Sequence, residues 1–117
     1  MVIELVQGDA SKVYKFCRRN ADGEIIQTIP QKMWLTCKNS YSSKEVVFQK
    51  TLEKGIDFSE EDHYYRFQIE SEESENLECK DYGFEIAILN EIGEKKTLLE
   101  NGILKIRNHY TKKENEV

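Results

Sequence analysis

Short runs of alternating apolar and polar residues, separated by turn-forming residues, restrict the fold of this chain more than any other feature. In one such run Met33, Leu35 and Cys37 fall on one side, with Trp34 and Thr36 on the other. Because successive side chains of a strand point to opposite faces, each run predicts a half-buried β-strand. The runs recur along the chain at 2–6, 12–19, 24–29, 32–38, 45–52, 64–70, 82–89, 95–100 and 102–107.

The spacing of these runs predicts an all-β fold, an antiparallel β-sandwich of seven to eight strands. Asp22–Gly23 and Asn101–Gly102 are both read as hairpin turns, since Asp-Gly and Asn-Gly favour the tight turns that join antiparallel strands. Pro30 ends the short strand predicted at 24–29, because proline cannot donate to a ladder. Segment 71–81 is the only helix candidate, with Ser74 as a possible N-cap, and a single turn between sheets is expected there.

Length and charge predict one β-sandwich domain over residues 1–108, followed by a polar, disordered tail at 109–117. The net charge of −5, with basic residues scattered, argues against nucleic acid as a partner and favours other proteins. No apolar run is long enough to cross a membrane, and the first residues lack the features of a signal peptide. We therefore expect synthesis and folding in the cytosol.

The three cysteines, Cys17, Cys37 and Cys79, are expected to be free thiols in a reducing compartment. The alternative is an immunoglobulin-type bridge between Cys17 and Cys79, with Trp34 between them. That pattern places the second cysteine two residues after a corner tyrosine, and the residue two after Tyr82 is Phe84. Cys79 therefore does not lie at the position that this disulfide bridge requires.

No group of residues in the sequence predicts an enzyme, a metal site or a cofactor site. His63 and His109 lie in polar stretches, with no nucleophile motif beside them, and are expected to be exposed. The acidic run 57–63 invites comparison with a calcium loop, but the places for the loop's glycine and final glutamate hold Asp62 and Gln68. The run 71–78 is read as a solvated acidic loop, with a docking surface for a basic partner as the alternative.

Leu77 and Tyr82 are predicted to form a structural corner at the entry to a late strand. In sandwiches of this kind a tyrosine at such a position can bond its hydroxyl back to the preceding loop. The role is one of stability, and neither residue is expected to take part in a functional site.

The order of these elements resembles a family of small phage and prophage tail proteins of Gram-positive bacteria. The resemblance rests on the early Gly8–Asp9 turn, "MWLTCKNSYSSKEVVFQKTL" at 33–52, the aromatic strand at 64–69 and "NGILKI" at 101–106. It is to the N-terminal domain of upper baseplate proteins, and it covers nearly the whole chain. Lys80 stands where the family pattern carries a glycine before the corner tyrosine, so that turn must be built differently here.

This resemblance implies an immunoglobulin-like sandwich and a non-enzymatic adaptor of a phage or prophage tail tip. Such a protein is made in the bacterial cytoplasm and is present in the virion after assembly. Expected partners are other tail or baseplate proteins, with a homo-oligomer possible. The loop "KNSYSSK" would connect two strands, the second at a sheet edge, and Tyr41, Ser42, Ser43 and Lys44 are its candidate partner-binding residues. A solvated loop is the alternative reading.

A second class of function is a carbohydrate- or host-surface-binding β-sandwich. Its candidate residues are aromatic, because sugars stack on aromatic faces, and this hypothesis requires several of them to be exposed on one face. They are Trp34, Tyr41, Tyr64, Tyr65 and Tyr110.

Overall fold

The computed structural model describes residues 1–40 and 42–108, which form an all-β structure with one short helix. Helix α1 spans Ser71–Glu75. No helix within these ranges is long and apolar enough to span a membrane. The strands are β1 (Val2–Val6), β2 (Tyr14–Phe16), β3 (Lys32–Lys38), β4 (Val46–Leu52), β5 (Gly55–Phe58), β6 (Tyr65–Phe67), β7 (Asp81–Leu89) and β8 (Lys95–Arg107).

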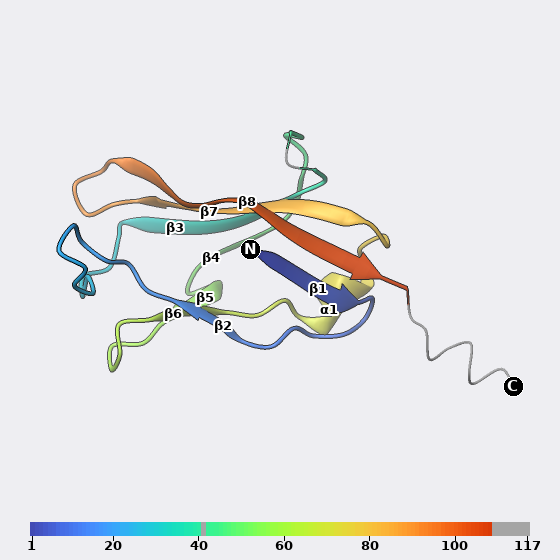
Figure 1. The fold of residues 1–117 in the computed structure, drawn as a ribbon, viewed down its shortest axis with the longest axis horizontal. Helices are drawn as coiled ribbons and strands as arrows, with labels where there is room; N and C mark the ends of the chain where they lie inside the picture. Colours follow the sequence, from blue (N-terminus) through green and yellow to red (C-terminus); the bar gives the residue numbers. More distant parts are fainter. Residues whose placement is uncertain (41, 109–117) are drawn as a thin grey trace, which may run out of the picture.

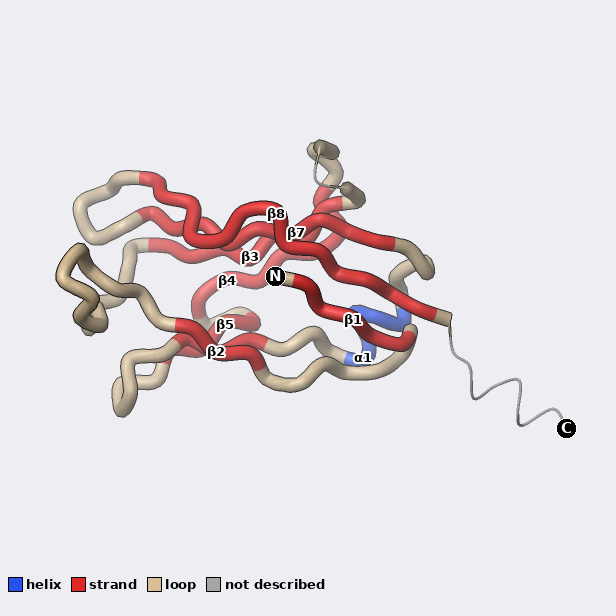
Figure 2. The backbone as a smooth tube through the Cα atoms, viewed as in Figure 1, coloured by secondary structure: helices blue, strands red, loops and turns tan. Residues whose placement is uncertain are grey.

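The strands form one curled sheet in the order β1-β8-β7-β3-β4-β5-β6-β2. Strands β3, β7 and β8 make one layer, and β5, β6 and β2 make the layer facing it (Figure 1). Strand β4 runs from the first layer to the second at the back of the molecule, so the two layers are joined there (Figure 2). At the front the two end strands, β1 and β2, are not paired with each other.

The sheet is mixed, so the prediction of a purely antiparallel sandwich is wrong in two places. Strand β1 pairs in parallel with β8, from Val2 opposite Ile103 to Val6 opposite Arg107. Strands β4 and β5 also pair in parallel, although they are adjacent in sequence. A tight loop makes the second pairing possible, with Glu53 (φ 70°) and Gly55 (φ 108°) in the left-handed region. Parallel strands normally require a connection of about a dozen residues or more, so the short spacing of these two strands did not suggest parallel pairing.

Asn101–Gly102 is not a hairpin turn, because β8 continues through it from Lys95 to Arg107. Asn101 has a φ of 57°, which an asparagine tolerates better than most residues. Gly102 is required for a different reason: a Cβ at this position would lie 2.7 Å from the Phe84 ring on the neighbouring strand. The glycine therefore allows a close cross-strand contact and does not reverse the chain.

Three smaller expectations also need correction. Segment 24–29 is not a strand, and only an isolated bridge joins Arg19 to Ile25. The strand after "KNSYSSK", β4, lies inside the sheet between β3 and β5 and not at an edge. Strand β5 was not predicted, because its four residues are too short a run for alternation to stand out.

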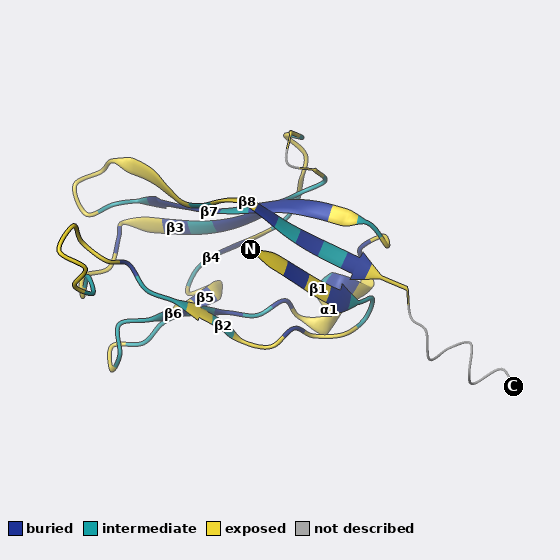
Figure 3. Cartoon of the chain, in the orientation of Figure 1, coloured by how far each residue is buried: buried dark blue, intermediate teal, exposed yellow. Residues whose placement is uncertain are grey.

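The core lies between the two layers, where the inward faces of the strands meet (Figure 3). The predicted inward residues of β3, β6 and β7 are buried, which confirms the alternation as the source of the core. At one end the core is closed by α1, whose Ser74 is fully buried. The Ser74 hydroxyl donates to the Asp9 carbonyl (2.6 Å) and accepts from the Gly8 N–H (3.1 Å). Ser74 thus ties the turn after β1 and is not an N-cap, since Glu70 holds that position.

Candidate functional site

The front of the curled sheet stays open because β1 is shorter than its partner β8. Strand β1 pairs only with the second half of β8, from Ile103 onward, whereas β7 pairs along nearly its whole length. On the side of β8 away from β7, residues 95–101 face no other strand of the described chain. Strand β2, at the opposite end of the sheet, pairs only with β6. We call the gap between residues 95–101 of β8 and β2 the seam.

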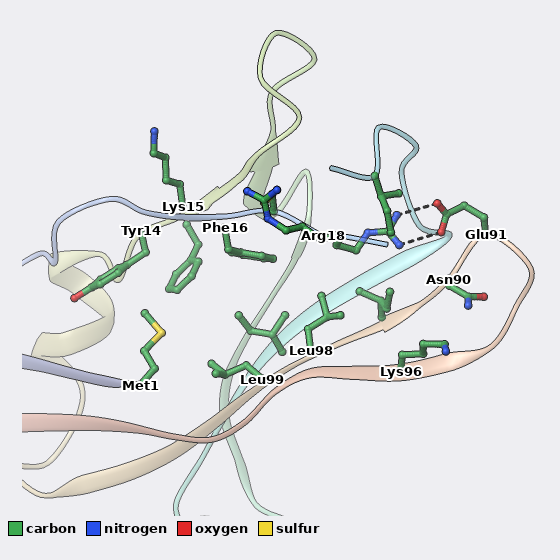
Figure 4. A pocket seen from close by; sticks show the side chains of 16 residues that line it. Met1, Tyr14, Lys15, Phe16, Arg18, Asn90, Glu91, Lys96, Leu98 and Leu99 are labelled. Atoms are coloured by element: carbon green, nitrogen blue, oxygen red, sulfur yellow. Dashed lines mark hydrogen bonds and ion pairs between the residues drawn. The ribbon is translucent and has the colours of Figure 1, made fainter. Parts of the chain in front are cut away.

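An apolar cavity of about 590 Å³ lies beneath the seam. Its floor and walls come from both layers and include Met1, Phe16, Phe67, Ile86, Ile88 and Leu99. Figure 4 shows the Phe16 side chain on one wall and Leu98 and Leu99 on the other. An irregularity in the β7–β8 register leaves Leu98 without a partner, and both of these consecutive leucines line the cavity. Leu98 remains 40% exposed.

The aromatic side chains of β2 and β6 hold the lower wall of the cavity in place. Phe16 stacks on Tyr65 with ring centroids 5.3 Å apart, and Tyr14 stacks on Phe67 at 5.5 Å. The connection from β1 to β2 is fixed by Ser11, whose hydroxyl accepts from the Ile69 N–H at 2.9 Å. A three-residue strand such as β2 gains little from its own ladder, so these side-chain contacts position it.

An ion pair between the two layers closes one end of the seam. The Arg18 guanidinium donates to both carboxylate oxygens of Glu91, at 3.1 and 2.9 Å (Figure 4). It also donates to the Thr28 carbonyl at 2.9 Å, and the Thr28 hydroxyl donates to Glu91. The Arg18 side chain is 6% exposed and that of Glu91 35%. Hydrogen bonding from Arg18 lowers the pKa of Glu91 to about 2.

The ion pair joins two turns with the same sequence pattern, N-x-x-G-E. In each turn the Asn side chain accepts from the backbone N–H two and four residues later, at Asn20 and again at Asn90. In each turn the backbone N–H of the Asn donates to the carbonyl of the Glu four residues later, Glu24 or Glu94. The glycine of each turn has a positive φ, 81° at Gly23 and 84° at Gly93. Arg18 precedes the first turn and Glu91 lies within the second. The repeated pattern was the signal in the sequence that could have predicted the β7–β8 hairpin.

Two buried polar atoms next to this ion pair, Arg18 Nε and the Tyr65 hydroxyl, have no hydrogen-bond partner among the residues that the structure describes. Burial raises the pKa of Tyr65, and the positive charge of Arg18 opposes that rise. The two groups thus interact electrostatically without a hydrogen bond of good geometry.

The Arg18–Glu91 pair predicts a loss of stability in acid. The carboxylate of Glu91 has an ordinary pKa of 4.5, lowered in the folded chain to about 2. The pair therefore stabilises the fold at pH values above the ordinary pKa of Glu91. This stabilisation is lost as the pH falls from about 5 to about 2. At neutral pH we expect Glu91→Gln to reduce the free energy of unfolding by about 1 kcal/mol, a modest value because Glu91 is one-third exposed.

Urea unfolding of both chains from pH 7 to pH 2 measures this contribution. The difference between wild type and Glu91→Gln should shrink towards zero at the acid end. A difference that stays constant across this range would show that the charge of Glu91 does not act through Arg18.

The loop predicted to bind a partner lies away from the seam. Tyr41 falls outside the described residues, Ser42 and Lys44 are exposed, and Ser43 is half-buried. The Ser43 hydroxyl accepts from the Glu45 N–H at 3.0 Å, a local contact that shapes the loop. None of the residues of this loop that the structure describes lines the cavity beneath the seam.

The corner residues Leu77 and Tyr82 are both buried. The Tyr82 hydroxyl accepts from the Glu78 N–H at 2.9 Å and donates to the Glu78 carbonyl at 3.2 Å. Glu78 lies in the loop that precedes β7, so the hydroxyl ties the start of this strand to the loop before it. The Gln7 side chain donates to the Leu77 carbonyl at 2.6 Å and connects the same loop to β1.

The other candidate residues for catalysis or metal binding are dispersed. His63 is half-buried and not exposed as predicted, with a φ of 63° and its ring 6.0 Å from that of Phe58; His109 falls outside the described ranges. Within the acidic run 57–63, Asp62 forms an ion pair with Arg66 at 2.6 Å. No three His, Cys, Asp or Glu side chains of the described residues are grouped as metal ligands would be.

The three cysteines are free, as predicted, with Cys37 buried, Cys17 half-buried and Cys79 exposed. Burial raises the pKa of the Cys37 thiol to about 12, so it stays protonated near neutral pH. Among the aromatic residues considered for sugar stacking, Tyr65 is buried and Trp34 and Tyr64 are half-buried. Tyr41 and Tyr110 fall outside the described residues.

Comparisons with known proteins identify the fold class. Neither protein-family models nor curated protein sequences match the chain. Among solved structures, the crystal structure of CopC from Methylosinus trichosporium OB3b is similar, with a TM-score of 0.50 and 10% sequence identity. The similarity covers 92% of this chain and 84% of that one. At such low identity it shows a shared fold, a CopC-like all-β structure, and nothing about activity.

Proposed function

We propose that this chain is a non-enzymatic protein-binding module that holds an extended segment of a partner along the seam. The observation that carries the proposal is the unpaired stretch of β8, residues 95–101, lying directly over an apolar cavity. Unpaired strand edges offer a row of N–H and C=O groups to an added strand. The cavity beneath would receive alternate side chains of that strand, and this burial supplies affinity that the edge alone does not.

The biological setting that we propose is the tail tip of a phage or prophage. The chain would be made in the bacterial cytoplasm and act as an adaptor between baseplate proteins in the virion. The family resemblance of the sequence supports this setting. We further propose that the curled sheet is a variant of the immunoglobulin-like sandwich of that family, a view supported by its two facing layers and by the hydroxyl bonds of Tyr82.

The carbohydrate-binding alternative has less support. It requires several exposed aromatic side chains on one face, and of its five candidates the three that the structure describes are buried or half-buried. No observation in the described part of the chain favours it over protein binding.

The test is co-expression of the chain with each protein encoded beside it, followed by light scattering of the purified complex at two concentrations. We expect a complex of defined mass, weakened at least about tenfold by Leu98→Ser, because Leu98 lines the cavity and is 40% exposed. Ile92→Ser is the matched control, since Ile92 is 79% exposed and lies outside the cavity. A chain that stays monomeric with every neighbour, or equal weakening by both variants, would contradict the proposal.

A further inference from the structure

We infer that the segment bound at the seam is acidic, with apolar side chains at alternate positions, and that it extends the line of β1 along residues 95–101 of β8. The inference rests on the proposed function and adds the chemistry and position of the partner. It depends on three observations: the distribution of charge, the lack of carboxylate partners among the described residues for most of the basic residues at the seam, and the geometry of β1.

Basic residues are concentrated on the two segments that border the seam. Residues 12–19 and 95–101 together carry six basic residues and one acidic residue, Glu100, whereas the rest of the chain carries 11 basic and 21 acidic residues. A basic strip on an otherwise acidic protein attracts negatively charged groups. The charge of the seam is thus opposite in sign to that of the chain as a whole.

Most of these cations have no carboxylate partner in residues 1–40 and 42–108. Arg18 is paired with Glu91, but no carboxylate of the described residues lies within ion-pair distance of Lys15, Arg19, Lys95 or Lys96. Lys15 is exposed and lies over the Tyr64 ring at 5.3 Å, pointing away from the cavity in Figure 4. Lys96 lines the cavity and is exposed. Carboxylates on the bound segment would therefore meet the exposed cations that line the cavity, Lys96 from β8 and Arg19 from the segment after β2.

Strand β1 shows where the segment would lie. It occupies the second half of the same edge of β8, pairs there with residues 103–107, and begins at the cavity, which Met1 lines. A segment paired with residues 95–101 would lie end to end with β1 and span about 23 Å, the length of seven residues in a strand. Its inward side chains would enter the apolar cavity between Phe16 and Leu99.

The same charges argue against a second copy of this chain joined seam to seam. Two seams brought together would place Lys95 and Lys96 of one copy against the basic residues of the other. Like charges on facing strands are destabilising, and lysines at sheet edges commonly prevent such pairing. An acidic segment from a different protein meets no such repulsion.

The test uses three labelled seven-residue peptides that alternate valine with glutamate, serine or lysine, and fluorescence anisotropy with the full chain. We expect the glutamate peptide to bind at least about tenfold more tightly than the serine peptide, and the lysine peptide most weakly. Lys96→Glu should weaken the glutamate peptide about tenfold and leave the serine peptide unchanged. Lys54→Glu, an exposed lysine outside the cavity with the same change in charge, is the matched control.

The outcomes separate this inference from the proposed function. Equal binding of the glutamate and serine peptides would overturn the acidic preference and leave strand binding in place. Binding of no peptide, or undiminished binding of a glutamate peptide whose backbone nitrogens are methylated, would overturn both. A concentration-dependent dimer that excludes the peptides would identify a second copy as the occupant and would also overturn the inference.

Discussion

Phe67→Ala is expected to reduce the free energy of unfolding by about 3–5 kcal/mol, the usual cost of removing a buried phenyl ring. Phe67 is 3% exposed, stacks on Tyr14 and contacts the edge of Phe16 at 6.3 Å between ring centroids. It also forms part of the cavity floor. The loss would be a large fraction of the total stability of a domain of this size.

Urea unfolding measures this effect, with Ile92→Ala as the control. Ile92 is 79% exposed, so its truncation should change the free energy of unfolding by no more than about 0.5 kcal/mol. If Phe67→Ala cost as little as Ile92→Ala, the aromatic wall of the seam would not be part of the folded core.

Glu73→Ala is expected to cost about 3 kcal/mol, because it leaves the buried ammonium of Lys50 without its partner. The Lys50 side chain is 6% exposed and its Nζ donates to Glu73 at 2.7 Å. The stem of Lys50 packs over Gly55, where a Cβ would lie 2.9 Å from its Cγ, so the charge cannot move freely to solvent. Glu73 also accepts from the Glu70 N–H at the start of α1 (2.8 Å).

Two further variants separate the ion pair from a general effect of charge. Glu75→Ala removes an exposed carboxylate from the same helix and should change the free energy of unfolding by no more than about 0.5 kcal/mol. The double variant Lys50→Met, Glu73→Ala should recover most of the loss, since it leaves no unpaired buried charge. No recovery would mean that Glu73 acts mainly through the helix start.

The Lys50–Glu73 pair changes the interpretation of the acidic run at 71–78. In the sequence it is a cluster of glutamates between two strands, which is typical of a solvated loop. In the structure one glutamate neutralises a buried lysine and Ser74 is fully buried. Residue types alone do not distinguish these roles, because the lysine that requires the carboxylate lies 23 positions earlier in the chain.

The shape of the seam explains how one fold can provide both a stable core and a binding edge. The core is closed at the back by β4 and at one end by α1 and β1, as Figures 1 and 2 show. Within the described chain, residues 95–101 of β8 are paired with β7 on one side and with no strand on the other. A partner strand added there would leave the existing pairing of β8 with β7 intact, so binding requires no rearrangement of the core.

Four properties could be predicted from the sequence: the all-β class, the approximate places of seven strands, the inward faces of β3, β6 and β7, and the free state of the cysteines. These properties follow from local alternation, since a side chain of a strand takes its face from its position in the run. The Asn20–Glu24 turn was also predictable, because asparagine and glycine at fixed positions build its hydrogen bonds.

Which strands are neighbours depends on contacts between distant parts of the chain and could not be predicted from the sequence. The parallel pairing of β1 with β8 joins residues about a hundred positions apart, such as Val2 and Ile103, and nothing in either run specifies the partner. Gly102 looked like a turn residue because a glycine can serve either a reversal or a close contact, and the choice depended on Phe84 across the sheet. The seam arises in the same way: β1 and β8 differ in length, and the unpaired remainder of β8 exists only once the two strands have met.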